Sequence, residues 1–136
     1  MTKNICFIIP ASEGIPNLQV IKGSDMPDHV RKMFLKVLSK LKQRIIWKWE
    51  TEEMEDKPDN VMLLKWCPQQ DILGHDNVKL FVTHGGLLST EESLYHGKPM
   101  LYIPGFADQF SNANKGERYG YARQLNWPTI TGEKLL

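Results

Sequence analysis

The stretch Val78-Lys-Leu-Phe-Val-Thr-His-Gly-Gly-Leu-Leu-Ser89 decides the fold, because it predicts a strand that passes directly into a helix. Residues 78–83 have the composition of a strand, and residues 87–96 are expected to form a helix that Gly97 closes. The two glycines between them allow the backbone to approach a ligand, and a helix N-terminus offers unpaired N–H groups. The sequence favours two interpretations of this turn equally: a binding site for an anion, or a tight turn without a ligand.

The rest of the chain alternates predicted strands with predicted helices. Apolar residues at helical spacing predict an amphipathic helix over 29–43, and a loop of turn composition is expected over 50–60. Such alternation implies βαβ units, so the predicted fold class is α/β, a parallel sheet with helices on both faces. Ligands of such sheets bind at the carboxyl ends of the strands. The remaining predicted strands are 5–9, 44–49, 61–66, 99–104 and 121–127, and the remaining helices are 68–73 and 108–119.

Composition excludes several classes of protein. The chain has 136 residues, a length that suits one globular domain. Its 17 Lys+Arg and 16 Asp+Glu nearly cancel, so the chain lacks the positive charge that binds a nucleic-acid backbone. The two cysteines form no CxxC pair, so neither a thiolate zinc site nor a disulfide framework is indicated. No apolar run is long enough to span a membrane, and the apolar part at 5–9 is too short for a signal peptide.

Several side chains near the predicted strand ends suit a nucleotide. His84 could donate a hydrogen bond to a phosphate oxygen, and the Ser89 hydroxyl could add a second contact. Glu91 or Glu92 could accept hydrogen bonds from ribose hydroxyls, although carboxylates are favoured in a first helical turn whatever the function. Trp66 could stack on a base, but taken alone a core tryptophan is the favoured interpretation.

Asp108 and Gln109 follow another predicted strand at the same edge of the sheet. An acid beside an amide could hydrogen-bond several hydroxyls of a sugar. The dipeptide alone favours an ordinary helix start, with the aspartate as N-cap.

These motifs occur in an order that resembles the signature of the UDP-glycosyltransferases, the family that includes the UDP-glucuronosyltransferases. The resemblance is dense over residues 66–109 and looser from about 22 to 135, and the Gly-Gly-Leu-Leu-Ser variant looks most like insect members, many of which use UDP-glucose. The segments that carry it are Trp66-Cys-Pro-Gln69, Asp71-Ile-Leu-Gly-His75, Phe81-Val-Thr-His-Gly-Gly86, Glu92, Tyr95-His-Gly-Lys-Pro99, Ile103-Pro104 and Asp108-Gln109.

The resemblance implies a GT-B enzyme, in which two Rossmann-like domains face each other, with this chain as the C-terminal, donor-binding half. Residues 22–136 would form the donor-binding domain. Residues 1–21 would be a divergent segment with a first strand and an altered loop, because Ile15-Pro-Asn-Leu-Gln19 stands where the family has a Phe-Ser-Leu-Gly-Ser-like sequence. The implied contacts are Trp66 with uracil, Gln69 with uridine, His84, Gly85, Gly86 and Ser89 with the diphosphate, Glu92 with ribose, and Asp108 and Gln109 with the transferred sugar.

The resemblance also implies what the chain binds and what it lacks. The co-substrate would be a UDP-hexose such as UDP-glucose or UDP-glucuronic acid, with no cofactor and no metal. Inverting transfer to a small lipophilic acceptor needs a His base in an N-terminal acceptor domain, so no catalytic residue is assigned to residues 1–136. The chain is therefore expected to be inactive alone, or to pair with a separate acceptor-domain chain. Family members are endoplasmic reticulum membrane proteins, whereas this chain is expected to be soluble and cytoplasmic.

Three other chemistries fit the sequence poorly. A zinc site from His75, His84 and His96 has poor spacing. A hydrolase using Ser89 with His84 lacks the G-x-S-x-G elbow. A dinucleotide-binding oxidoreductase lacks a G-x-G-x-x-G turn after the first strand.

Overall fold

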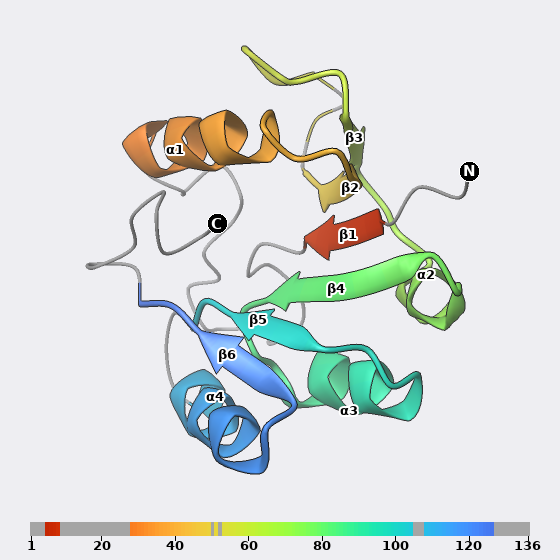
Figure 1. The fold of residues 1–136 in the computed structure, drawn as a ribbon, viewed down its shortest axis with the longest axis vertical. Helices are drawn as coiled ribbons and strands as arrows, with labels where there is room; N and C mark the ends of the chain where they lie inside the picture. The colour runs from red at the N-terminus through yellow and green to blue at the C-terminus, as the bar shows by residue number, and fades with distance from the viewer. Residues whose placement is uncertain (1–4, 9–27, 50, 52, 105–107, 127–136) are drawn as a thin grey trace.

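The computed structural model describes residues 5–8, 28–49, 51, 53–104 and 108–126, which form one parallel sheet with flanking helices (Figure 1). Six strands pair in the order β3-β2-β1-β4-β5-β6, and every pair is parallel. The predicted α/β, Rossmann-like class is therefore confirmed. The elements are β1 (Ile5–Ile8), α1 (Asp28–Leu38), β2 (Arg44–Lys48), β3 (Val61–Leu64), α2 (Gln69–Gly74), β4 (Val78–Thr83), α3 (Leu87–Tyr95), β5 (Met100–Tyr102), α4 (Asp108–Tyr119) and β6 (Ala122–Gln124).

The strand order reverses between β1 and β4. The chain builds outward from β1 to β2 and β3, and then returns to place β4 on the other side of β1. In open parallel sheets, ligands bind beyond the carboxyl ends of the strands at such a reversal. The turn that follows β4 begins there with His84, so the topology places this turn at the favoured position for a ligand.

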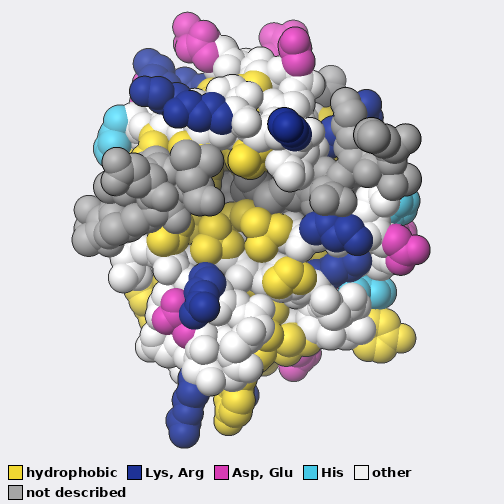
Figure 2. All heavy atoms as spheres, viewed as in Figure 1, with side chains coloured by type: hydrophobic (Ala, Val, Ile, Leu, Met, Phe, Trp, Pro, Cys, Tyr) yellow, Lys and Arg dark blue, Asp and Glu magenta, His cyan; other side chains and the backbone are white. Residues whose placement is uncertain are grey.

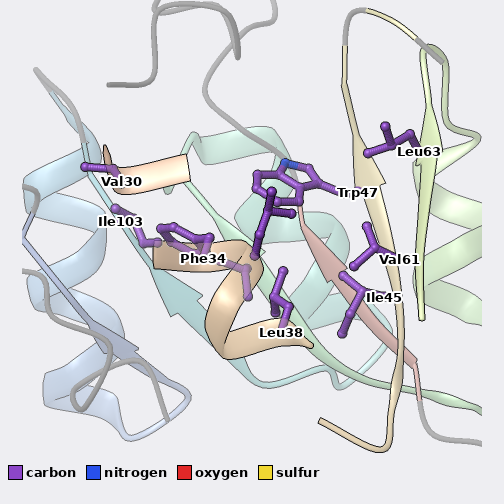
Figure 3. Packing of buried hydrophobic residues seen from close by; sticks show 10 residues of the cluster. Val30, Phe34, Leu38, Ile45, Trp47, Val61, Leu63 and Ile103 are labelled. Atoms are coloured by element: carbon purple, nitrogen blue, oxygen red, sulfur yellow. The ribbon is translucent and has the colours of Figure 1, made fainter. Parts of the chain in front are cut away.

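Helices cover both faces of the sheet, as predicted. On one face α1 packs its apolar side onto β2 and β3, where Phe34 lies against the buried ring of Trp47 with ring centroids 6.0 Å apart (Figure 3). On the other face a second cluster joins Leu73 of α2 and Ala113 of α4 to Phe81 of β4. Burial of these apolar surfaces is the main force that holds the layers together.

The helix predicted over 29–43 is shorter in the structure and ends at Leu38. The side-chain amide of Asn60 explains this end, since its Nδ2 donates to the carbonyl oxygens of Leu38, Leu41 and Gln43 at 2.8, 3.2 and 3.1 Å. A side chain from a distant loop thus donates to carbonyl groups at and beyond the helix end, which no further helical turn satisfies. Leu41 still packs against the core, which is why the apolar spacing continued past the real end.

Other boundaries follow the predictions to within a few residues. Helix α4 spans the predicted 108–119 and is followed by Gly120 at φ 79°. The helix predicted over 68–73 begins one residue later, because Pro68 is its N-cap and not part of its first turn. The predicted altered loop at 15–19 lies outside the described residues, so the domain boundary at residues 21 and 22 stays a prediction. Within the described part of the chain, no helix is both long and apolar enough to cross a bilayer.

Candidate functional site

The turn between β4 and α3 is the centre of the candidate site. Gly85 has φ +93°, which favours glycine, and its N–H donates to Thr83 Oγ1 at 3.3 Å. Gly86 is the extended N-cap of α3, with φ −60° and ψ 147°. The predicted passage from strand to helix through two glycines is therefore confirmed, and it leaves the first N–H groups of α3 directed beyond the sheet edge.

His84 lies in this turn, and one of its ring nitrogens has no partner in the described part of the chain. Its Nδ1 is buried and makes no hydrogen bond to any described residue. Its Nε2 lies over Gly86, 2.8 Å from the position that a Cβ at residue 86 would occupy. Burial lowers the pKa of His84 below its usual range, although the nearby charge of Asp108 acts in the opposite direction. The ring is thus a neutral imidazole, and its Nδ1 keeps a hydrogen-bonding capacity that no described residue uses.

Gln69 joins α2 to α3 and brings three of the predicted site residues together. Its Nε2 donates to Ser89 Oγ at 3.1 Å and to Glu92 Oε2. Gln70 donates to the other carboxylate oxygen of Glu92 at 3.2 Å. Glu91 is exposed, so of the two adjacent acids it is Glu92 that α2 holds in a fixed orientation.

Trp66 is exposed, and the interpretation favoured for this residue taken alone was wrong. The side chain is 72% exposed in the loop after β3, where a core tryptophan would be almost fully buried. It lies three positions before Gln69 in the chain. An exposed indole beside a polar network is available to stack on a planar ligand.

The start of α4 closes the other side of the turn. Asp108 is exposed at the first position of α4, and Gln109 is buried. The backbone oxygen of Gln109 lies 3.3 Å from the Cβ position of Gly85, so α4 and the turn are in contact. Asn112 Nδ2 donates to the carbonyl oxygen of Gly85 at 2.8 Å. This contact was missed from the sequence, although spacing of four residues places Asn112 on the same helical face as Asp108.

Tyr102 forms a buried floor beneath the turn. Its hydroxyl shares a 2.9 Å hydrogen bond with Thr90 Oγ1 of α3, and burial raises the pKa of Tyr102. Its Cδ1 atom lies 3.3 Å from the Cβ position of Gly85. Its role was also missed, because nothing in the apolar run 99–104 shows that one ring underlies the turn.

Figure 2 shows basic and acidic side chains interspersed on the visible face, with much uncharged surface between them. Among the described residues, no three His, Cys, Asp or Glu side chains gather as a metal ion would require. The groups available to a ligand are therefore the His84 ring, the N–H groups at the start of α3, the Glu92 carboxylate and the exposed indole.

Comparison with known proteins connects this arrangement to a family. The profile described as "UDP-glucoronosyl and UDP-glucosyl transferase" matches residues 20–136. UDP-glycosyltransferase UGT5 of Dactylopius coccus is 45% identical over 117 residues, which are 86% of this chain and 22% of that protein. UDP-glucuronosyltransferase 2B16 of Oryctolagus cuniculus is 35% identical over 113 residues, 83% of this chain and 22% of the relative. The chain thus spans about a fifth of the length of these relatives.

Solved structures agree on the fold. The glycotransferase of kitacinnamycin superposes with a TM-score of 0.77 at 24% identity, and the match covers 98% of this chain and 33% of that one. The fold is therefore that of one Rossmann-like domain of a GT-B glycosyltransferase. Together with the match over residues 20–136, this shows that the chain belongs to the UDP-glucuronosyl and UDP-glucosyl transferase family and corresponds to its C-terminal domain.

Proposed function

We propose that this chain binds the UDP-hexose donor of a glycosyl transfer at the carboxyl edge of its sheet. The observation that carries the proposal is the buried Nδ1 of His84, which has no hydrogen-bond partner among the described residues and lies beside the glycine turn and the N-terminus of α3. A buried polar atom without a partner costs free energy, and a bound phosphate oxygen would supply the partner. The first N–H groups of α3 and its dipole favour an anion at the same place.

The remaining parts of the donor fit the residues around the turn. Ser89 and Gly86 lie beside the diphosphate position, and Glu92 presents a carboxylate to the ribose hydroxyls. Gln69 orients that carboxylate through its hydrogen bond, so it supports the ribose contact and lies against the uridine. The exposed indole of Trp66 stacks on uracil, since an aromatic face accepts any planar base.

The sugar lies toward the start of α4. Asp108 is exposed there and offers a carboxylate to sugar hydroxyls, whereas Gln109 is buried and contacts the turn through its backbone. The two residues therefore contribute differently: Asp108 by direct hydrogen bonds, and Gln109 by its amide where the sugar meets the diphosphate. The names of the curated relatives, which include glucosyl and glucuronosyl transferases, support a hexose as the transferred group.

In the transfer itself, this chain stabilises the leaving group, UDP. An acceptor oxygen attacks the anomeric carbon, the bond from that carbon to the UDP oxygen breaks, and UDP departs with the electron pair. His84 and the N–H groups of α3 stabilise the negative charge that grows on the diphosphate. The proton of the acceptor goes to a base in an acceptor domain, which is the second part of the proposal.

Exposed apolar residues beside the site support such a second domain or chain. Leu87 and Leu88, at the start of α3, are 54% and 76% exposed. Apolar side chains at the mouth of a binding site are suited to contact with a partner surface. The chain alone is then expected to bind donor without transferring it. Mixing it with an acceptor-domain chain of the family is expected to yield product, and persistent inactivity of that mixture would remove this part of the proposal.

Calorimetric titration of the 136-residue chain with UDP tests donor binding directly. Saturable binding is expected for UDP, with weaker binding of ADP, which shares the diphosphate, and of uridine, which lacks it. His84→Ala is expected to weaken UDP binding about tenfold, as for a lost charge-assisted hydrogen bond. His29→Ala, at an exposed histidine of α1, is the matched control. Absence of saturable UDP binding to the folded chain would overturn the proposal.

A further inference from the structure

The peptide between Gly85 and Gly86 has a fixed direction. Its carbonyl oxygen accepts a 2.8 Å hydrogen bond from Asn112 Nδ2 on α4. The peptide is trans, and in a planar trans peptide the N–H points opposite to the carbonyl. The N–H of Gly86 is therefore directed away from α4, and no partner for it is found among the described residues.

Packing around Gly85 prevents this peptide from rotating independently. The backbone oxygen of Gln109 and the ring of Tyr102 both lie 3.3 Å from the Cβ position of Gly85. Tyr102 is in turn held by its hydroxyl, which is hydrogen-bonded to Thr90. The turn is thus confined by α4 and by β5, while Asn112 supplies a side-chain hydrogen bond that selects the carbonyl direction.

We infer that Asn112 is a positioning residue for the donor diphosphate, because it orients the Gly85–Gly86 peptide so that the Gly86 N–H faces the ligand beside the His84 ring. The inference rests on the proposed function and deepens it. Asn112 itself does not touch the donor. If the peptide flipped, the carbonyl oxygen of Gly85 would face the diphosphate, and repulsion would replace a hydrogen bond.

A simpler role for Asn112 is to tie α4 to the rest of the fold. The two roles predict different losses when the amide is removed. A tie between elements affects the free energy of unfolding and the binding of all ligands together. An orienting residue affects the ligands that contain a diphosphate and leaves the nucleoside alone, because only the phosphates meet the Gly86 N–H.

Two substitutions at Asn112 remove its hydrogen-bond donor, and two substitutions at Asn114 serve as controls. Asn112→Ala deletes the amide, and Asn112→Asp keeps its size while replacing the N–H donor with an acceptor oxygen. Asn114→Ala and Asn114→Asp make the same changes on the same helix, where Asn114 contacts the side chain of Gln124 and not the turn. The aspartate pair therefore matches the added charge, and the isosteric variant remains informative if the alanine variant folds poorly.

The test compares binding of UDP with binding of uridine in the wild type and the four variants. Both Asn112 variants are expected to bind UDP about tenfold more weakly and uridine equally well, with both Asn114 variants unchanged. In ¹H–¹⁵N spectra, the Gly86 amide is expected to shift on UDP addition in the wild type and not in Asn112→Ala. Wild-type UDP binding retained in both Asn112 variants would overturn the inference, as would an equal loss for uridine. A wild-type chain that does not bind UDP would instead overturn the proposed function, and the inference with it.

Discussion

The side-chain amide of Gln69 and the carboxylate of Glu92, 23 residues apart in the chain, meet between α2 and α3 in a direct hydrogen bond. The bond joins α2, which follows the loop with Trp66, to the helix whose N-terminus forms the candidate diphosphate site. Because Gln70 reaches the second oxygen of the same carboxylate, the two glutamines fix Glu92 from one side. The orientation of this acid therefore depends on α2, which supplies both glutamines.

Replacing the amide with a carboxylate tests this relationship. Gln69→Glu places two negative charges in contact, and the free energy of unfolding at pH 7 is expected to fall by about 1 to 2 kcal/mol. The loss is expected to shrink near pH 4, where carboxylates become protonated. Urea unfolding at both pH values measures it. Gln70→Glu is the control, because Gln70 is exposed and water screens its charge; equal losses in the two variants would contradict the assigned role of Gln69.

Trp66 gives the cleanest separation of binding from stability. Its side chain is 72% exposed, so Trp66→Ala is expected to change the free energy of unfolding by no more than about 0.5 kcal/mol. Loss of base stacking is expected to weaken UDP binding by about tenfold or more, measured by calorimetry. Trp66→Phe should retain much of the affinity, and Met62→Ala, at another exposed side chain of the same strand region, should retain all of it. Unchanged UDP affinity in Trp66→Ala would exclude stacking.

Gly86 and Gly97 are required for different reasons: a side chain at residue 86 would clash, whereas residue 97 has a positive φ. Gly86 has an ordinary φ of −60°, but a Cβ there would lie 2.8 Å from His84 Nε2. Gly97 has φ +65° and open space around its Cβ position. Gly86→Ala is therefore expected to displace His84 and weaken UDP binding with little backbone strain. Gly97→Ala is expected to cost about 1 kcal/mol in the free energy of unfolding and to leave binding intact. The reverse pattern in calorimetry and urea unfolding would refute this division.

The sequence predicted the elements whose signals are local. Helix α4 and the passage from β4 to α3 depend on nearby residues, namely the glycines at their turns, and both were placed correctly. The end of α1 was not, because it depends on Asn60, whose amide reaches back to Leu38 across 22 residues of chain. No local pattern contains such a contact.

The residues of the candidate site likewise divide into those that the sequence predicted and those that it did not. The order of the motifs predicted that Gln69, Ser89 and Glu92 belong to one site. In the structure, Gln69 is hydrogen-bonded to both Ser89 and Glu92. The exposure of Trp66 was misjudged from the residue alone, because an indole at a strand end suits a core and a surface equally well. Asn112 was missed, since its partner Gly85 lies 27 residues earlier and a backbone carbonyl leaves no trace in the sequence.

Gly116 in α4 tests the packing that supports the turn from below. An alanine in a helix interior usually adds up to about 1 kcal/mol of stability over glycine. Here, however, a Cβ would lie 2.8 Å from both Ala122 Cβ and Tyr102 Cε2, so overpacking costing about 1 to 3 kcal/mol outweighs the gain in propensity. Gly116→Ala is therefore expected to lower the unfolding free energy, measured with urea. Ser111→Ala, at an exposed position of the same helix, is the control. A stabilised Gly116→Ala variant would show that Tyr102 is not tightly held.

The proposed donor binding is expected to depend on pH, with a sign that follows from the pKa of His84. In the free chain, burial lowers its pKa below the usual value of about 6.5, so the ring is neutral at pH 7. A bound diphosphate favours the protonated ring and raises that pKa, so binding takes up a proton, and affinity is expected to rise as the pH falls from about 7.5 to 5.5. UDP-glucose is the ligand to use, because its diphosphate is esterified at both ends and does not titrate in this range. The free energy of unfolding is expected to fall as the pH falls, since the unfolded chain binds the proton more readily than the folded one below about pH 6.5. Each titration therefore needs a parallel unfolding curve. His84→Gln is expected to bind more weakly and to lose the pH dependence, and a variant that kept the wild-type slope would assign the proton to another group.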